Sequence, residues 1–363
     1  MRADNTTPFM REEVARRSLE FLFSHANQAA GLSLILWGGE PLLNPRLLES
    51  VLTYARRLST RTNTPLRVAT TTNATLLTQG VIDLLIEHRV VVNLSLDGNA
   101  VSHDANRTFK NGKGSYSTVE RSVCRLVEAG RRCPGFPMPM ARMTLSHSTV
   151  KSFVDNHKAI WALGVPIVWC KDVDWLPDGS DLALTDEDYV RLASEYEVLR
   201  KYIIDELDRP DGARFWPQLN WDLGRLHTRV KRTMACGAGH SGVTVGTDGQ
   251  VWVCYHLTGR GGEYLLGDIW EGARTQDRQA IYSQICYVDE LSTCRECELK
   301  YFCDGRCFAK AIFHGLHPSS CWTGQCKFIR TYRAHCLHLY AALMRSKHVQ
   351  AVRTHFEPKL QKL

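Results

Sequence analysis

The residues with the clearest potential for chemistry are the cysteines near the end of the chain. Ten of the thirteen cysteines follow residue 235, and the stretch CRECELKYFCDGRC (294–307) spaces four of them as C-x2-C-x5-C-x3-C. Thiolates bind soft metals, and a C-x2-C pair presents two sulfurs to one metal ion or one cluster edge. Four-cysteine zinc sites usually contain two such pairs. The single pair here favours an iron–sulfur cluster, with zinc as the alternative.

Two more cysteines enclose a predicted β-hairpin. In CGAGHSGVTVGTDGQVWVC (236–254), valines alternate on both sides of the turn TDGQ, and Gly249 lies in that turn. This alternation is typical of two antiparallel strands joined by a tight turn. Cys236 and Cys254 therefore belong with the later cysteines in one small, cysteine-rich domain, which also includes Cys321 and Cys326.

The first two-thirds of the chain alternate strand and helix patterns. Short apolar or β-branched runs predict strands buried on both faces, at 32–37, 66–70, 90–96, 140–145 and 165–170. Helical periodicity lies between them and again at 185–207. The pattern predicts an α/β fold, a parallel sheet covered by helices that curls into a partial barrel. A helix at 11–26 precedes the first strand, so such a barrel would lack its first strand.

Unusual residues follow the predicted strands, where parallel α/β folds bind ligands. The first strand runs into WGGEP (37–41), with Gly38, Gly39 and Glu40. The second runs into TTNATLL (71–77) with Asn73, and the third into SLDGNAVSHDANR (95–107). Arg142 lies in the fourth strand and could bind a carboxylate. Each motif alone could be an ordinary turn or surface residue.

Taken together, these motifs resemble the radical SAM superfamily over residues 10 to about 205. WGGEP resembles the GGEP motif, which implies that Gly38, Gly39 and Glu40 bind the methionyl amino group of S-adenosylmethionine. TTNATLL is similar to a Thr-Asn-Gly-Thr signature, with Ala74 in place of the glycine. The resemblance further implies that Ser95 and Asp97 face the ribose and that Arg142 reaches the carboxylate. It implies a partial (β/α)6 TIM-like barrel.

One family motif is absent from this sequence. Radical SAM enzymes carry C-x3-C-x2-C after their first strand, where it binds the [4Fe–4S] cluster that cleaves S-adenosylmethionine, whereas the first cysteine here is Cys124. The motif and the first strand are therefore missing together, because they belong to the same segment in the family. A reading frame that starts too late and a natural deletion both explain it, and the otherwise intact cofactor motifs favour the late start. We expect no cofactor cleavage by the chain as given.

The cysteine pattern resembles the SPASM domain, which follows radical SAM domains in enzymes that modify peptides and proteins and carries one or two auxiliary [4Fe–4S] clusters. The resemblance implies that Cys236, Cys254 and Cys307 hold the first cluster. Cys294, Cys297 and Cys303 would hold the second, with Cys326 or Cys321 as the last ligand. Cys326 is preferred by its gap of eighteen residues from Cys307. Cys286 has no assigned role, and Cys336 is expected in the core.

The resemblance implies a radical SAM/SPASM maturase, an oxidoreductase-type enzyme that modifies a ribosomally synthesised peptide or a protein side chain and needs an electron donor. Two alternatives are a non-catalytic iron–sulfur paralogue that binds peptides and a zinc-stabilised binding protein. We predict a barrel-like domain at 1–208, a linker at 209–235, a SPASM domain at 236–340 and a helical tail at 341–363.

Composition supports an intracellular protein without a nucleic-acid or membrane partner. The formal charge is +7 over 363 residues, and the basic residues are scattered. No apolar run reaches the roughly 20 residues of a membrane span, and the first residues do not form a secretion signal. We therefore expect a cytoplasmic protein, in which many free cysteines imply metal chemistry rather than disulfides.

Overall fold

The computed structural model describes residues 9–26, 31–173, 175–176, 179–234, 236–273, 287–303 and 307–360. The contacts divide the chain into two compact units. The first comprises Met1–Asn93, Glu128–Met138 and Cys236–Tyr287, and the second Leu94–Val127, Pro139–Ala235 and Val288–Leu363. The domain boundaries expected from the sequence stay a prediction. Part of the predicted linker at 209–235 is helical, because it contains η3 (Gly212–Phe215) and α8 (Trp216–Thr228).

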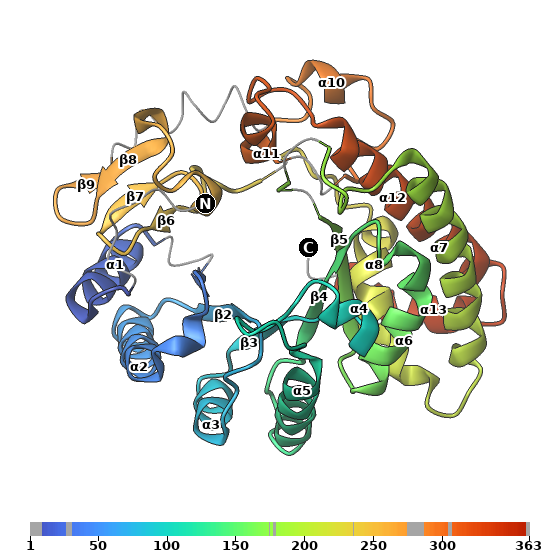
Figure 1. Cartoon of the computed structure of the whole chain (residues 1–363), viewed down its shortest axis with the longest axis horizontal. Coiled ribbons are helices and arrows are strands. Elements are labelled where there is room, and N and C mark those ends of the chain that lie inside the picture. Colours follow the sequence, from blue (N-terminus) through green and yellow to red (C-terminus); the bar gives the residue numbers. More distant parts are fainter. Residues whose placement is uncertain are drawn as a thin grey trace. The chain divides into compact units, whose positions relative to one another are not determined.

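The main sheet has five strands in the order β1-β2-β3-β4-β5, of which Figure 1 labels β2 to β5. They are β1 (Leu32–Leu36), β2 (Leu66–Thr72), β3 (Val91–Ser95), β4 (Met140–Leu145) and β5 (Ile167–Asp172). The pairs β1–β2 and β4–β5 are parallel. The predicted α/β class and all five predicted strands are confirmed.

Helices connect these strands, and several begin with a side-chain cap. Asn44 accepts a hydrogen bond from Leu47 N–H at the start of α2, and Thr185 forms a capping box with Asp188 at the start of α7. The helices are α1 (Glu12–Ser24), η1 (Pro41–Leu43), α2 (Pro45–Thr62), α3 (Gln79–Glu87), α4 (Ala100–Asp104), α5 (Tyr116–Arg131), η2 (Val150–Ser152), α6 (Phe153–Ala162) and α7 (Asp186–Leu207).

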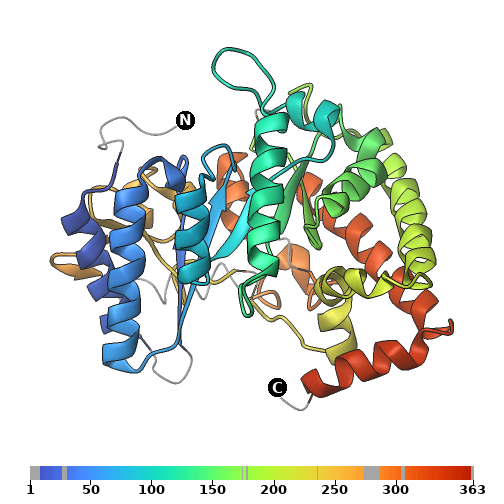
Figure 2. The same cartoon turned by 90° about the horizontal axis from the view of Figure 1, so that it is seen from below.

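In the first unit, α1 and α2 pack against the outer side of β1 and β2. Leu19 and Phe23 of α1 meet Ala55 and Leu58 of α2, with Leu34 of β1 against them. Figure 2 shows α2 and α3 side by side across the strands. The prediction that the strands are buried on both faces is wrong. Side chains alternate between buried and partly exposed in β3 and β4, and Ile35 of β1 is 62% exposed.

The predicted hairpin after Cys236 is confirmed and extends into a small antiparallel sheet of the first unit. Its strand order is β6-β7-β8-β9. The elements are β6 (Thr244–Val245), β7 (Gln250–Trp252), η4 (Tyr255–Leu257), η5 (Gly262–Tyr264), β8 (Leu265–Asp268) and β9 (Gly272–Ala273). Gly249, at φ 87°, provides the left-handed turn residue.

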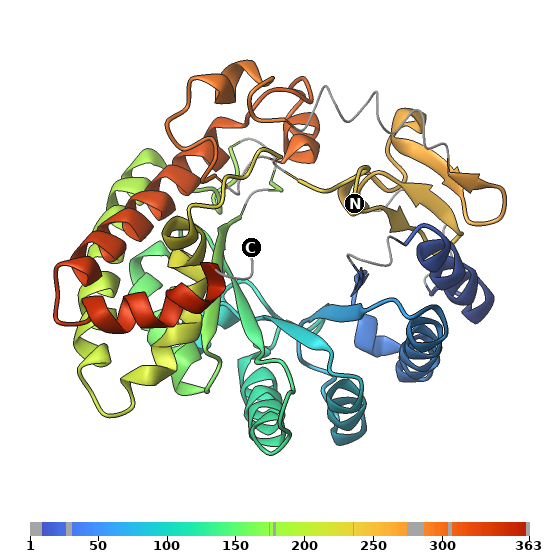
Figure 3. The ribbon, with the colours of Figure 1, turned by 180° about the vertical axis from the view of Figure 1, so that it is seen from behind.

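In the second unit, the long helix α12 (Thr323–Met344) packs against α7, α8 and α13 (Val349–Leu360), as seen from behind in Figure 3. The short helices α10 (Ser292–Arg295) and α11 (Phe308–Phe313) precede it. Cys336 of α12 is fully buried, as expected. None of the helices in the described ranges has a stretch long and apolar enough to cross a bilayer.

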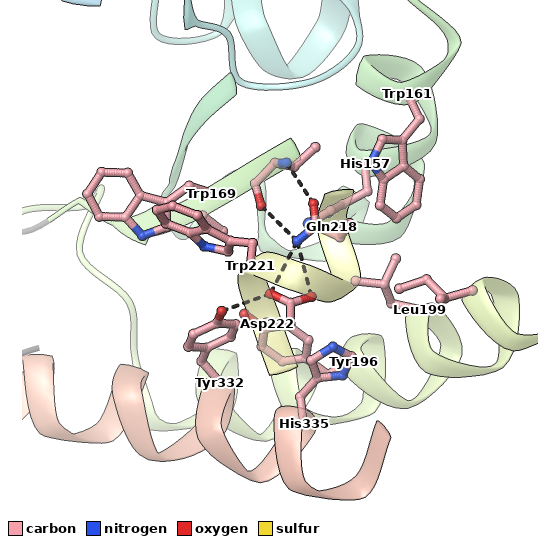
Figure 4. Close-up of a pocket in the computed structure, with 13 residues that line it drawn as sticks. His157, Trp161, Trp169, Tyr196, Leu199, Gln218, Trp221, Asp222, Tyr332 and His335 are labelled. Carbon is pink, nitrogen blue, oxygen red and sulfur yellow. Dashed lines mark hydrogen bonds between the residues drawn. The ribbon is translucent and has the colours of Figure 1, made fainter. Parts of the chain in front are cut away.

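A buried polar chain joins β5 to α8 and α12 (Figure 4). The Gln218 side chain accepts from Val168 N–H at 2.7 Å and donates to Val168 C=O at 3.4 Å. Its amide also donates to Asp222, which accepts from Tyr332 O–H at 2.8 Å. The cavity beside them has a volume of about 10 Å³, room for one water molecule and far too small for a substrate.

Candidate functional site

The end of β1 is tied to the end of β2 through Glu40. One Glu40 carboxylate oxygen accepts from Thr72 O–H at 2.8 Å and from Leu42 N–H at 3.1 Å, and the other accepts from Asn73 N–H at 2.7 Å. An ionised carboxylate has about four acceptor positions. Capacity for a ligand amino group therefore remains, and the protein donors hold the carboxylate in one orientation.

The glycines before Glu40 leave room for a ligand. A Cβ atom added at Gly38 would meet nothing within 4 Å, and Gly38 and Gly39 are both exposed. Packing within the protein therefore gives no reason for glycine at position 38. The open space beside the backbone fits the cofactor-binding role that the resemblance implies for this turn.

The loop after β2 has the backbone shape that a glycine would favour. Ala74 has φ 62° and is fully buried, although this left-handed region is unfavourable for residues with a side chain. On one side of it, the Asn73 side chain accepts from Thr75 N–H at 3.0 Å and from Thr75 O–H at 2.7 Å. This loop therefore keeps its conformation despite the alanine.

Asp97 follows β3 and is held by the protein itself. Its carboxylate accepts from Arg107 Nε at 2.5 Å and Nη2 at 3.0 Å, and from Thr144 N–H at 2.8 Å. The Asp97 side chain is 2% exposed. This geometry links the third and fourth strands, and sequence reasoning missed Arg107 as its partner. Ser95 is half-buried at the end of β3. The ribose roles of Ser95 and Asp97 stay predictions.

Arg142 belongs to a positively charged group on one face of β4 and β5. Its guanidinium carbon lies 4.8 Å from the centre of the Trp169 ring, its cross-strand partner. Lys171 lies two residues after Trp169. Burial lowers the pKa of Lys171, the Arg142 charge lowers it further, and Cys307 and Asp172 oppose both effects. Two neighbouring cations favour an anion such as the carboxylate that we predict for Arg142. Sequence reasoning missed Lys171.

The predicted cofactor residues form two groups, one in each unit. Glu40 and Asn73 are joined in the first unit, with Gly38 and Gly39 in the same turn. Ser95, Asp97 and Arg142 belong to the second unit. That both groups bind one molecule of S-adenosylmethionine stays a prediction.

Four cysteines from two segments gather in the second unit. The sulfurs of Cys294 and Cys321 are 3.5 Å apart. The pKa of Cys326 is raised, first by a hydrogen bond with Cys321, then by burial and by the neighbouring Cys321, Cys303 and Cys294. Cys321 and Cys326, the two candidates for the last ligand of the second cluster, therefore belong to one group of four neighbouring cysteines. This donor set fits the soft-metal chemistry of an iron–sulfur cluster.

The remaining cysteines have separate surroundings. The sulfur of Cys297 accepts from Arg330 at 3.6 Å, and Cys307 N–H donates to the Gln325 side chain at 3.3 Å. In the first unit, Cys254 is buried, and the sulfur of Cys236 accepts from Ala238 N–H at 3.4 Å. Among the described residues, no three His, Cys, Asp or Glu side chains are arranged as a single-ion site. The cluster assignments of Cys236, Cys254, Cys294, Cys297, Cys303, Cys307, Cys321 and Cys326 stay predictions, and Cys286 lies outside the described residues.

Comparison with known proteins defines the class of the first part of the chain. Residues 6–148 match the family model of the Radical SAM superfamily, so the chain contains a radical SAM domain. The resemblance found in the sequence motifs is thereby confirmed.

Two curated proteins are similar in sequence. A serine-type anaerobic sulfatase-maturating enzyme of Bacteroides thetaiotaomicron is 27% identical over 300 residues, 76% of this chain and 68% of that protein. An uncharacterized protein of Methanocaldococcus jannaschii is 32% identical over 103 residues, 28% of this chain and 34% of that protein.

Solved structures share the fold over most of the chain. The structure of native anSMEcpe with bound AdoMet and Kp18Cys peptide has a TM-score of 0.72 at 17% identity, and covers 92% of this chain and 91% of that one. Native anSMEcpe with bound AdoMet has the same TM-score at 18% identity, with coverage of 93% and 90%. The fold therefore includes the C-terminal cysteine-rich region as well as the radical SAM domain.

Proposed function

We propose that this chain is a radical SAM/SPASM maturase of the sulfatase-maturating type, which modifies a side chain in a peptide or protein. The observation that carries the proposal is the gathering of Cys294, Cys303, Cys321 and Cys326 from two segments, in a chain that also contains a radical SAM domain. S-adenosylmethionine and the iron–sulfur clusters would supply the radical and electron-transfer chemistry. The chain would need an electron donor for this reaction.

The chain's own residues would bind and orient the cofactor. Glu40, held by three donors, is preorganised to accept from an amino group, and the positive charges of Arg142 and Lys171 favour a carboxylate. Equilibrium binding of S-adenosylmethionine to the full chain tests this. Glu40→Gln and Arg142→Met should each weaken binding by about tenfold, the effect of roughly 1.4 kcal/mol. Arg121→Met, on the exposed side of α5, is the control. Equal affinity in all variants would contradict the assignment.

We further propose that residues 1–363 do not cleave S-adenosylmethionine. No cysteine precedes Cys124, so the three thiolates of the family motif are missing from this sequence. The test compares the chain with a version extended upstream, in frame, through a C-x3-C-x2-C motif. Under a strong reductant and without air, only the extended protein should form 5′-deoxyadenosine. Formation above background by residues 1–363 would refute the proposal.

Metal analysis separates this function from a zinc-stabilised binding protein. We expect the protein purified without air to be brown, with iron and acid-labile sulfide in near-equal amounts. Colourless protein with zinc alone would overturn the cluster assignment. A brown protein whose extended version stays inactive would instead favour the non-catalytic iron–sulfur paralogue.

A further inference from the structure

Helix α12 contacts the cysteine-rich segment at several points within the second unit. Gln325 accepts from Cys307 N–H, and Cys326 belongs to the group of four neighbouring cysteines. The Arg333 guanidinium lies 4.2 Å from the centre of the Phe302 ring. A further contact places a charged donor, the Arg330 guanidinium, against the sulfur atom of Cys297.

Arg330 binds two adjacent residues with one guanidinium group. Nη1 donates to the Glu298 carboxylate at 2.5 Å, and Nη2 donates to the sulfur of Cys297 at 3.6 Å. The planar fork of arginine gives such paired contacts a fixed geometry, which a lysine ammonium cannot reproduce. Glu298 thus holds the guanidinium in place while the second nitrogen points at the sulfur.

We propose that Arg330 is a positioning residue that raises the reduction potential of the auxiliary cluster bound by Cys297. This inference rests on the proposed function, in which Cys297 is a cluster ligand. One-electron reduction makes a cluster more negative without forming or breaking a covalent bond. A positive N–H donor at a ligand sulfur stabilises that added charge, and hydrogen bonds to the sulfurs are among the features that set cluster potentials.

The proposal predicts a graded response to substitution. Arg330→Met removes both the charge and the hydrogen bond, and should shift the reduction equilibrium toward the oxidised cluster by about three- to tenfold. A tenfold shift is 59 mV for a one-electron couple. Arg330→Lys keeps the charge without the fork, so its potential should lie between those of wild type and Arg330→Met.

Lys327→Met is the matched control. It removes one positive charge from the same helix, where Lys327 pairs with Asp186. If nearby charge alone sets the potential, this variant will shift it in the same direction as Arg330→Met. If the contact with the sulfur sets the potential, Lys327→Met will leave it unchanged.

The experiment is a redox titration of the full chain without air, followed by electron paramagnetic resonance, with iron and sulfide counted in each variant. We expect a lower midpoint potential for one cluster in Arg330→Met at unchanged iron content. An unchanged potential, an equal shift in Lys327→Met, or a loss of iron without a shift in the remaining clusters would overturn the role of Arg330. Wild-type protein without iron and sulfide would overturn the proposed function itself.

Discussion

The Lys310 ammonium lies 3.8 Å from the Asp172 carboxylate, and their side chains are 0% and 3% exposed. Lys310 is in α11, three residues after Cys307, and Asp172 is the last residue of β5. Burial lowers the pKa of Lys310 to about 7, and Asp172 partly opposes this shift. Burial raises the pKa of Asp172. The pair connects the carboxyl end of β5 to the helix that follows Cys307.

Removing one partner of this pair should destabilise the second unit strongly. Lys310→Met leaves the Asp172 carboxylate buried without its cation, and the loss from breaking such a pair is about 3–5 kcal/mol. Adding Asp172→Asn should recover part of this loss, because the buried carboxylate left without Lys310 is then removed. Urea unfolding measures both variants. A double variant less stable than Lys310→Met would contradict this account.

The stability of the second unit should fall in acid because of His157. Burial lowers the pKa of His157 to about 4, from 6.5. The unfolded chain binds a proton below pH 6.5, whereas the folded protein keeps the imidazole neutral until about pH 4. The stability from neutral His157 is therefore fully present above pH 6.5. About 3 kcal/mol is lost as the pH falls to 4.

One histidine variant separates this effect from other titrating groups. His157→Gln should reduce the slope of unfolding free energy between pH 6.5 and 4, measured by denaturant unfolding at each pH. Some slope will remain in His157→Gln, because burial also lowers the pKa of His335, to about 3. Equal slopes in wild type and His157→Gln would rule out this contribution.

The loop after β2 should tolerate glycine but not a larger side chain at position 74. Ala74→Gly relieves the left-handed strain of about 1–2 kcal/mol, but it adds freedom to the unfolded chain and removes a buried methyl group. We expect a net change within about 1 kcal/mol. Ala74→Val adds a β-branched side chain at φ 62° in a fully buried position. It should cost more than about 2 kcal/mol, as thermal unfolding would show.

Substitution of Cys321 or Cys326 should reduce the amount of bound iron–sulfur cluster, because both residues neighbour Cys294. Cys326→Ala should reduce iron and sulfide most, as the ligand preferred from the sequence. Cys321→Ala should reduce them less if Cys321 supports the site without binding iron. Cys124→Ala, at an exposed position on α5, is the control. An effect of Cys321→Ala larger than that of Cys326→Ala would reverse the assignment.

The sequence predicted the elements better than their contacts. The strand at 140–145 was predicted to the residue, and the one predicted at 165–170 occupies Ile167–Asp172. Burial on both faces was wrong, because apolar runs do not reveal that one face of β3 and β4 remains partly exposed. Periodicity also gave no sign of α8 in the predicted linker, where aromatic and polar residues interrupt the apolar stripe.

The same limit applies to the candidate site. The motif resemblance predicts roles for Glu40 and Asp97, but their hydrogen-bond partners depend on contacts between strands. The bond from Thr72 to Glu40 spans 32 residues, and the one from Thr144 to Asp97 spans 47. Arg330 is 33 residues from Cys297. No local pattern specifies such pairs. The sequence therefore predicts which residue types are present for chemistry but not which side chains contact one another.

The side-chain amide of Gln218 affects whether another strand can pair with the edge of the main sheet. β5 ends the strand order of the main sheet, and an exposed strand edge readily recruits a further strand from another molecule. At Val168 both backbone groups are occupied by the Gln218 side chain, which is itself held by Asp222. A side chain therefore occupies the place of a sixth strand there. A further strand therefore cannot pair with the backbone of Val168.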